Sequence, residues 1–158
     1  MSDTAPTAPP PAPDAGPVQP AIRVIMMPKD TNALGTIFGG IILSYIDQAG
    51  AVEGSRHVAG RLVTVAMDEV VFHQPVFVGD LVSFYTETLR RGRTSVTVRV
   101  TVEAQRRHRP GGFSRVKVTD ANLTFVHVDE DNRPIPLEQP SGAPGSALLP
   151  STGTADSA

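Results

Sequence analysis

The chain has 158 residues, a formal net charge of −2 and no cysteine, which bounds it to one domain of ordinary size and excludes disulfides, zinc–thiolate sites and thiol nucleophiles. Its apolar runs are far shorter than the ~20 residues needed to cross a bilayer, and its first residues lack the basic-then-apolar order of a secretory signal, so we expect a soluble cytoplasmic protein with no membrane partner. The four histidines show no metal-ligand spacing, so we expect no metal site.

Proline and small polar residues dominate both ends of the chain. Twelve of the fifteen prolines lie before residue 21 or after residue 133, among almost no large apolar side chains. Such segments bury too little apolar surface to offset the entropy that they lose on ordering. The composition therefore predicts disordered tails at residues 1–20 and 138–158 around a single domain at residues 21–137.

The first part of this domain predicts a short strand and then a buried helix. Ile22–Met27 has strand composition, and the proline, aspartate and asparagine of residues 28–32 favour a turn after it. A loop leads to Gly39-Gly40, and from Ile41 to Val58 apolar residues cover most of the helix circumference. A helix that is apolar nearly all round is a buried helix.

The middle of the domain predicts two strands. β-Branched residues from Leu62 to Phe77 predict one long or bent strand that is interrupted near Pro75. Val78-Gly79-Asp80 has turn composition, and it precedes a second strand at Leu81–Leu89. Both strands belong to the same predicted sheet.

Two further strands close the domain. Arg91-Gly92 has hairpin-turn composition, and between Arg93 and Gln105 apolar and polar residues alternate, so this strand has one buried and one wet face. The last strand, Arg115–Val128, changes its apolar parity partway along. A bulge near Thr119-Asp120 would produce that change.

The predicted order is one strand, one long helix and then four antiparallel strands in a meander. The helix needs apolar cover on most sides, and each amphipathic strand needs one covered face. A single antiparallel sheet wrapped around one central helix satisfies both needs. We therefore predict an α+β fold.

Two features of the predicted helix could carry chemistry, and each allows a second interpretation. Asp47 has apolar neighbours, and a buried carboxylate is found where it has hydrogen-bonding partners or a catalytic role. It is therefore a structural acid bonded to a strand or a catalytic acid. Gly39-Gly40 either presents unpaired backbone N–H groups to a carbonyl oxygen that gains negative charge, or permits a tight turn into the helix.

The spacing of Gly40 and Asp47 indicates where such a site would form. They are seven positions apart, so they share a helix face but lie ~10 Å apart along the axis. One reacting carbonyl carbon cannot easily sit beside both within one chain. If both act on it, a second copy places its own glycines opposite Asp47, which predicts a site shared between two chains.

A basic segment lies between Arg90 and Lys117, where Glu103 is the only acid. Such a segment either attracts anions or forms a solvated face. Phosphate groups would be held by the side chains and loop amides of Arg90, Arg91, Gly92, Arg93, Thr94 and Ser95. The strands of this segment lack interleaved aromatic residues for base stacking, so we expect no nucleic-acid partner.

Other hydrolase and nucleotide-binding motifs are missing from the sequence. Ser44 lies in no G-x-S-x-G elbow, which disfavours a serine hydrolase. The chain contains neither a G-x-x-x-x-G-K-[ST] loop nor a strand-linked G-x-G-x-x-G.

Six short motifs follow one another along the domain: Pro28-Lys29-Asp30-Thr31-Asn32, Gly35-Thr36-Ile37-Phe38-Gly39-Gly40, Ile46-Asp47-Gln48-Ala49-Gly50, Val63-Thr64-Val65, Pro75-Val76-Phe77-Val78-Gly79-Asp80 and Gly92-Arg93-Thr94-Ser95-Val96. In this order they closely resemble the YciA-like acyl-CoA thioesterases of the hotdog superfamily. The joint resemblance covers about Ile22 to Leu137. It is far more specific than any one motif.

The resemblance implies a hotdog fold, a homodimer that joins two sheets, and often a homohexamer made of three dimers. It also implies hydrolysis of acyl-CoA to a free acid and CoA, with no cofactor beyond the CoA of the substrate. By resemblance, Asp47 is the catalytic carboxylate, Asn32 works with the aspartate of the partner chain, and Gly39-Gly40 is the glycine pair of the site. Residues 92–95 correspond to the segment near the CoA nucleotide.

Two questions stay open at the level of sequence. The alternative function is a hotdog module that binds acyl-CoA without turnover, because the fold hosts both kinds of protein. Hydration chemistry is disfavoured, since no histidine lies near Asp47 in the sequence. The carboxylate either attacks the thioester to form an anhydride or activates a water molecule, and both routes need the same residue in the same place.

Overall fold

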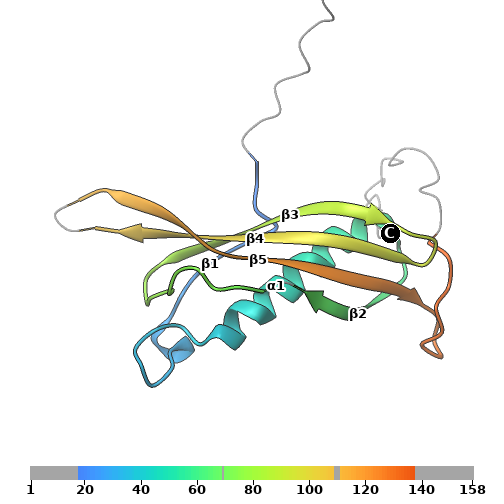
Figure 1. The fold of residues 1–158 in the computed structure, drawn as a ribbon, viewed down its shortest axis with the longest axis horizontal. Helices are drawn as coiled ribbons and strands as arrows, with labels where there is room; N and C mark the ends of the chain where they lie inside the picture. Colours follow the sequence, from blue (N-terminus) through green and yellow to red (C-terminus); the bar gives the residue numbers. More distant parts are fainter. Residues whose placement is uncertain (1–17, 69, 109–110, 138–158) are drawn as a thin grey trace, which may run out of the picture.

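A five-stranded antiparallel sheet carries one long helix across one of its faces (Figure 1). The strands are β1 (Ile22–Ile25), β2 (Arg61–Asp68), β3 (Leu81–Arg91), β4 (Ser95–Arg107) and β5 (Phe113–Val128), and the helix is α1 (Gly39–Gly54). This computed structural model describes residues 18–68, 70–108 and 111–137. The tails predicted at residues 1–20 and 138–158 lie outside these ranges, apart from residues 18–20. The predicted α+β fold with one central helix is confirmed.

The strand order corrects part of the predicted topology. The order across the sheet is β1-β3-β4-β5-β2, so β3, β4 and β5 form a meander, whereas β2 pairs with β5 and not with β3. The predicted strand at Leu62–Phe77 is also too long, because it ends at Asp68. The described residues between 70 and 80 have no strand, since the chain must there cross from one side of the sheet to the other.

The alternation predicted for Arg93–Gln105 is confirmed from Ser95 onward, where β4 begins, while Arg93 and Thr94 precede the strand. The apolar residues of β4 are completely buried, and they are Val96, Val98, Val100, Val102 and Ala104. Val102 of β4 pairs with Thr119 of β5, and the next residue of β4, Glu103, pairs with Lys117 of β5. This pairing leaves one extra residue in β5, Val118. This bulge was predicted one residue further along, and it explains why the consecutive residues Val118 and Thr119 are both buried.

The helix lies close to the sheet along one side only. Its buried residues recur at helical spacing, and they are Ile42, Ile46, Ala49, Gly50, Glu53 and Gly54. A Cβ atom on Gly50 would lie 2.9 Å from the Phe125 ring, so glycine is required for this close approach. On the other side Ser44, Gln48 and Val52 are exposed. The predicted burial of the whole helix is therefore wrong within one chain, because a single sheet covers only one side.

An ion pair fixes the start of β3 against the end of β4. Arg106 Nη2 lies 2.8 Å from Asp80 Oδ2, and the Asp80 side chain is only 4% exposed. Asp80 Oδ2 also accepts a hydrogen bond from the Phe77 backbone N–H. The Arg106 side chain donates hydrogen bonds to both oxygens of Asp80, and these bonds raise the pKa of Arg106 above its usual value. The guanidinium and the carboxylate thus hold the turn at residues 77–80.

Asp80→Ala is expected to destabilise the fold by about 3 kcal/mol, because it leaves the Arg106 charge and the Phe77 N–H without their partner. Thermal unfolding at one fixed protein concentration measures the effect. Asp131→Ala is the matched control: its carboxylate also lies 2.9 Å from an arginine, Arg133, but both side chains are exposed. It should cost less than about 0.5 kcal/mol. Equal losses in the two variants would contradict the proposed contribution of burial.

Candidate active site

Asp47 lies in the middle of α1 and is half-buried. Thr64 of β2 donates a hydrogen bond of 2.6 Å to its Oδ1 atom. No other hydrogen bond or ion pair from the described residues reaches this carboxylate. Asp47 therefore keeps one oxygen available to a substrate or a water molecule. Thr64 was not predicted to have a role, although its place in the Val63-Thr64-Val65 motif was a signal.

Glu53 is a second carboxylate on the same helix, and its surroundings differ from those of Asp47. It is nearly buried. Its Oε1 accepts a hydrogen bond from Thr88 Oγ1 at 2.9 Å, and its Oε2 accepts one from Thr86 Oγ1 at 3.2 Å. Arg56 Nη1 lies 3.3 Å from Oε2. Glu53 has the partners that a structural acid requires, on both of its oxygens.

Asn32 closes the loop that precedes the helix. Its Oδ1 accepts hydrogen bonds from the backbone N–H groups of Leu34 (2.9 Å) and Thr36 (3.3 Å), and its Nδ2 donates to Thr36 Oγ1 at 2.8 Å. An amide nitrogen has two N–H donors, so one donor remains after the bond to Thr36. Asn32 is thus held in one orientation with one N–H left over.

Gly39 and Gly40 form the first turn of α1. Phe38 precedes them as the N-cap and supplies no side-chain hydrogen bond, and the first N–H groups of a helix have no partner within it. A Cβ atom on Gly40 would collide with the exposed Phe38 ring unless that ring moved. The two interpretations of the glycine pair are therefore compatible, because glycine leaves room for the ring where it lies while the N–H groups stay available.

A cavity of about 340 Å³ opens beside Gly39. It is mostly apolar, and its walls are Ile37, Gly39, Ile42, Phe72, His73, Gln74, Pro75 and Val76. This cavity was not predicted, because residues 72–76 were expected to belong to a long or bent strand interrupted near Pro75. An apolar space beside unpaired helix N–H groups suits an ester or thioester with an apolar chain.

The predicted phosphate-binding residues lie on the hairpin that joins β3 to β4. Its turn is closed by a 2.7 Å hydrogen bond from Gly92 N–H to Ser95 O, and the carbonyls of Thr94 and Arg93 accept bonds from the backbone of His127 and Leu137. The side chains of Arg90, Arg91 and Arg93 are exposed. The hairpin is therefore a fixed backbone that carries three cationic side chains toward solvent.

The single chain does not bring the predicted site residues together. Asn32 and Gly39 lie at the start of α1, and Asp47 lies in its middle. Thr88, which precedes the basic hairpin, forms hydrogen bonds with Glu53 at the far end of α1 and with His57 just beyond it. A helix of 16 residues is about 24 Å long. The residues thus occupy three successive positions along one helix.

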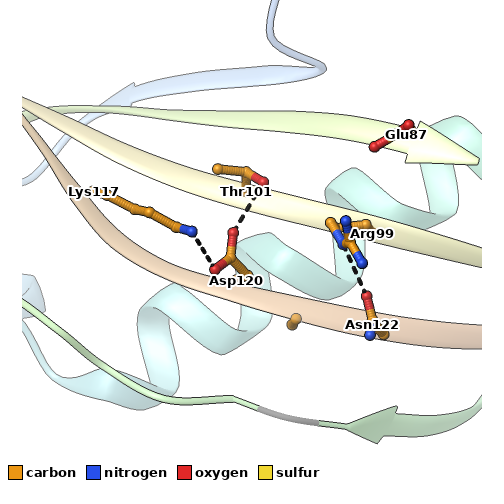
Figure 2. A pocket seen from close by; sticks show the side chains of 7 residues that line it. Glu87, Arg99, Thr101, Lys117, Asp120 and Asn122 are labelled. Atoms are coloured by element: carbon orange, nitrogen blue, oxygen red, sulfur yellow. Dashed lines mark hydrogen bonds and ion pairs between the residues drawn. The ribbon is translucent and has the colours of Figure 1, made fainter.

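A polar pocket of about 390 Å³ lies on the face of the sheet that is turned away from the helix (Figure 2). Lys117 Nζ lies 2.6 Å from Asp120 Oδ2, and Thr101 Oγ1 donates to Asp120 Oδ1. Burial alone would raise the pKa of Asp120, but the hydrogen bonds from Lys117 and Thr101 outweigh it and lower that pKa. These groups satisfy one another, and the pocket contains no predicted site residue.

Among residues 18–68, 70–108 and 111–137, no three side chains of the metal-binding types gather into a group. In the same part of the chain, no helix combines the length and the apolar character that crossing a membrane requires.

Comparison with known proteins gives consistent matches. The profile of the family described as "Thioesterase superfamily" matches residues 34–110. An uncharacterized acyl-CoA thioester hydrolase of Zymomonas mobilis is 44% identical over 73% of this chain and 76% of its own, and the acyl-CoA thioester hydrolase YciA of Salmonella typhimurium is 39% identical over 73% and 87%. The crystal structure of a hexameric hotdog-fold thioesterase of Campylobacter jejuni superposes with a TM-score of 0.73, at 44% identity over 76% of this chain and 90% of that one.

Proposed function

Since the chain belongs to the hotdog-fold thioesterase superfamily and is a YciA-like acyl-CoA thioester hydrolase, we propose that Asp47 is its catalytic carboxylate. The reaction adds water to the thioester carbonyl of an acyl-CoA, and the C–S bond breaks to give a carboxylic acid and CoA. A carboxylate promotes this reaction by attacking the carbonyl carbon or by taking a proton from the attacking water. Thiol release by an Asp47→Asn variant tests the assignment.

The contrast between Asp47 and Glu53 carries this proposal. Both are acids of one helix, but Glu53 has hydrogen bonds on both oxygens and an arginine beside it, whereas Asp47 has one hydrogen bond, from Thr64. A half-buried carboxylate with a free oxygen is available for chemistry, while a saturated one is structural. The Thr64 hydroxyl holds Asp47 in one rotamer and leaves its other oxygen for the reaction.

We infer that each site is completed by a second copy of the chain. Gly39 and Asn32 of that copy would lie opposite Asp47, where their N–H groups stabilise the negative charge that grows on the carbonyl oxygen. Strand β2 supports this arrangement because it is an edge strand, and Val65 on it is 56% exposed. An unpaired edge with exposed apolar residues is a surface for pairing. Val52 of α1 is likewise an exposed apolar residue.

We propose further that three such dimers form a homohexamer. The thioesterase of Campylobacter jejuni is hexameric, and it superposes on three quarters of this chain. Closed oligomers of identical chains are usually symmetric. A trimer of dimers would therefore contain six copies of the site.

We propose that the hairpin arginines bind the phosphates of CoA. Replacing Arg90 and Arg93 by alanine should raise KM for acyl-CoA about tenfold and change kcat less, because the phosphates are held in both the ground state and the transition state. The increase should shrink at high salt. Steady-state thiol release at two ionic strengths measures both effects.

The matched control for this prediction removes two positive charges from the outer face of the sheet. Arg115→Ala with Lys117→Ala changes the net charge equally, but these side chains pair with Glu103 and Asp120 on the face opposite the helix. KM should stay within about twofold of the parent. An unchanged KM in the Arg90 and Arg93 variant would place the CoA phosphates elsewhere.

A further inference from the structure

A second apolar surface lies where the β4–β5 hairpin projects beyond the helix (Figure 1). Four exposed residues form it, and we call them the hairpin patch: Ile25 (56% exposed), Phe77 (38%), Val78 (46%) and Phe113 (61%). They line a groove of about 790 Å³. Exposed apolar patches with a polar rim mark interaction surfaces.

Arginine side chains hold the hairpin patch in a fixed shape. The guanidinium of Arg106 lies 4.5 Å from the centre of the Phe77 ring, and Asp80 and the Pro75 carbonyl fix it in place. The guanidinium of Arg107 lies 5.6 Å from the centre of the Phe113 ring. Preorganised aromatic and arginine side chains supply much of the binding energy at protein interfaces. The patch therefore has the composition and the rigidity of a protein-binding surface.

The position of the patch indicates which partner covers it. A closed hexamer built from two-fold dimers needs a second kind of contact between identical chains, in addition to the dimer contact. The dimer contact proposed above uses β2, which is the last strand of the sheet, whereas Ile25 lies on β1, which is the first. Ile25 thus lies on the edge that the proposed dimer leaves free, and Phe77, Val78 and Phe113 line the same groove.

We propose that the hairpin patch is the contact between neighbouring dimers of the hexamer. This inference rests on the hexamer proposed above, and its partner is a second copy of this chain. The contact repeats around a closed assembly, so each copy of it can be modest while the ring as a whole is stable. Phe113 is the most exposed of the four patch residues, and it stands on the projecting hairpin.

Phe113→Asp should convert the hexamer into dimers. At one fixed concentration, light scattering behind size-exclusion chromatography should give the mass of six chains of 16.7 kDa, about 100 kDa, for the full-length parent. The variant should give the mass of two chains, a threefold fall, because a buried unpaired charge opposes the contact. Val78→Lys is an independent second variant with the same expected result. Val18→Asp is the matched control, since Val18 is 78% exposed but lies outside the patch, and it should remain hexameric.

The outcomes separate this proposal from the proposed function. Hexamers of both patch variants would overturn the proposal, and so would monomers, because monomers would assign the patch to the dimer contact. A dimeric parent would overturn the hexamer and the patch together, while thiol release by that same preparation would leave the hydrolase assignment intact. Circular dichroism confirms that each variant compared is folded.

Discussion

Asp47→Asn is expected to lower the turnover of acyl-CoA by ~100-fold or more. The amide has nearly the shape of the carboxylate and can still accept the hydrogen bond from Thr64. It cannot take a proton from water, and it is a poor nucleophile, so both routes to hydrolysis are lost. Thiol release across a panel of acyl-CoA esters measures the loss, and CoA binding should be largely intact.

Glu53→Gln is the matched control for this substitution. It makes the same chemical change on the same helix, at a carboxylate that Thr86, Thr88 and Arg56 already engage. It should lower the melting temperature but keep turnover within about threefold of the parent, because Glu53 has no free oxygen. A folded Asp47→Asn protein with near-normal turnover would remove Asp47 from the mechanism. Similar losses in both variants would indicate a general disturbance of the helix.

Co-expression of two inactive variants, Asn32→Ala and Asp47→Ala, is expected to restore about a quarter of the parental activity. If each site takes Asp47 from one chain and Asn32 from the other, a mixed dimer has one doubly mutated site and one intact site. Random pairing makes half of the dimers mixed, and half of their sites are intact, which assumes independent sites and a closed two-fold dimer. Specific activity per chain of the purified mixture measures the recovery.

Two further preparations make the result interpretable. Each variant expressed alone should have little activity, and Asp47→Ala co-expressed with the parent should give about half of the parental value, since half of the sites then hold an aspartate. The melting temperature of Asn32→Ala checks that the loop at residues 32–36, which the Asn32 side chain closes, still forms. Absence of recovery in a demonstrably mixed preparation would mean that each site draws both residues from one chain.

Local patterns of residues predicted the individual elements of the fold. The alternation along β4, the bulge in β5 and the long helix that carries Asp47 were all predicted, because the periodicity of apolar residues reflects which face of an element is covered. The order of the motifs also identified the family, which the comparisons confirmed. The roles of Asp47, Asn32 and the hairpin arginines stay predictions that the experiments above test.

The way in which distant segments meet was seen only in the folded chain. The pairing of β2 with β5, the irregular crossing at residues 70–80 and the apolar cavity beside Gly39 depend on contacts between residues far apart in the chain, which no local pattern encodes. The same holds for the hydrogen bond from Thr64, which left Asp47 with one free oxygen, and for the bonds that saturate Glu53. One sheet has only one inner face, so it covers one side of an apolar helix, and the exposure of Val52 and Val65 became visible only when that sheet was in place.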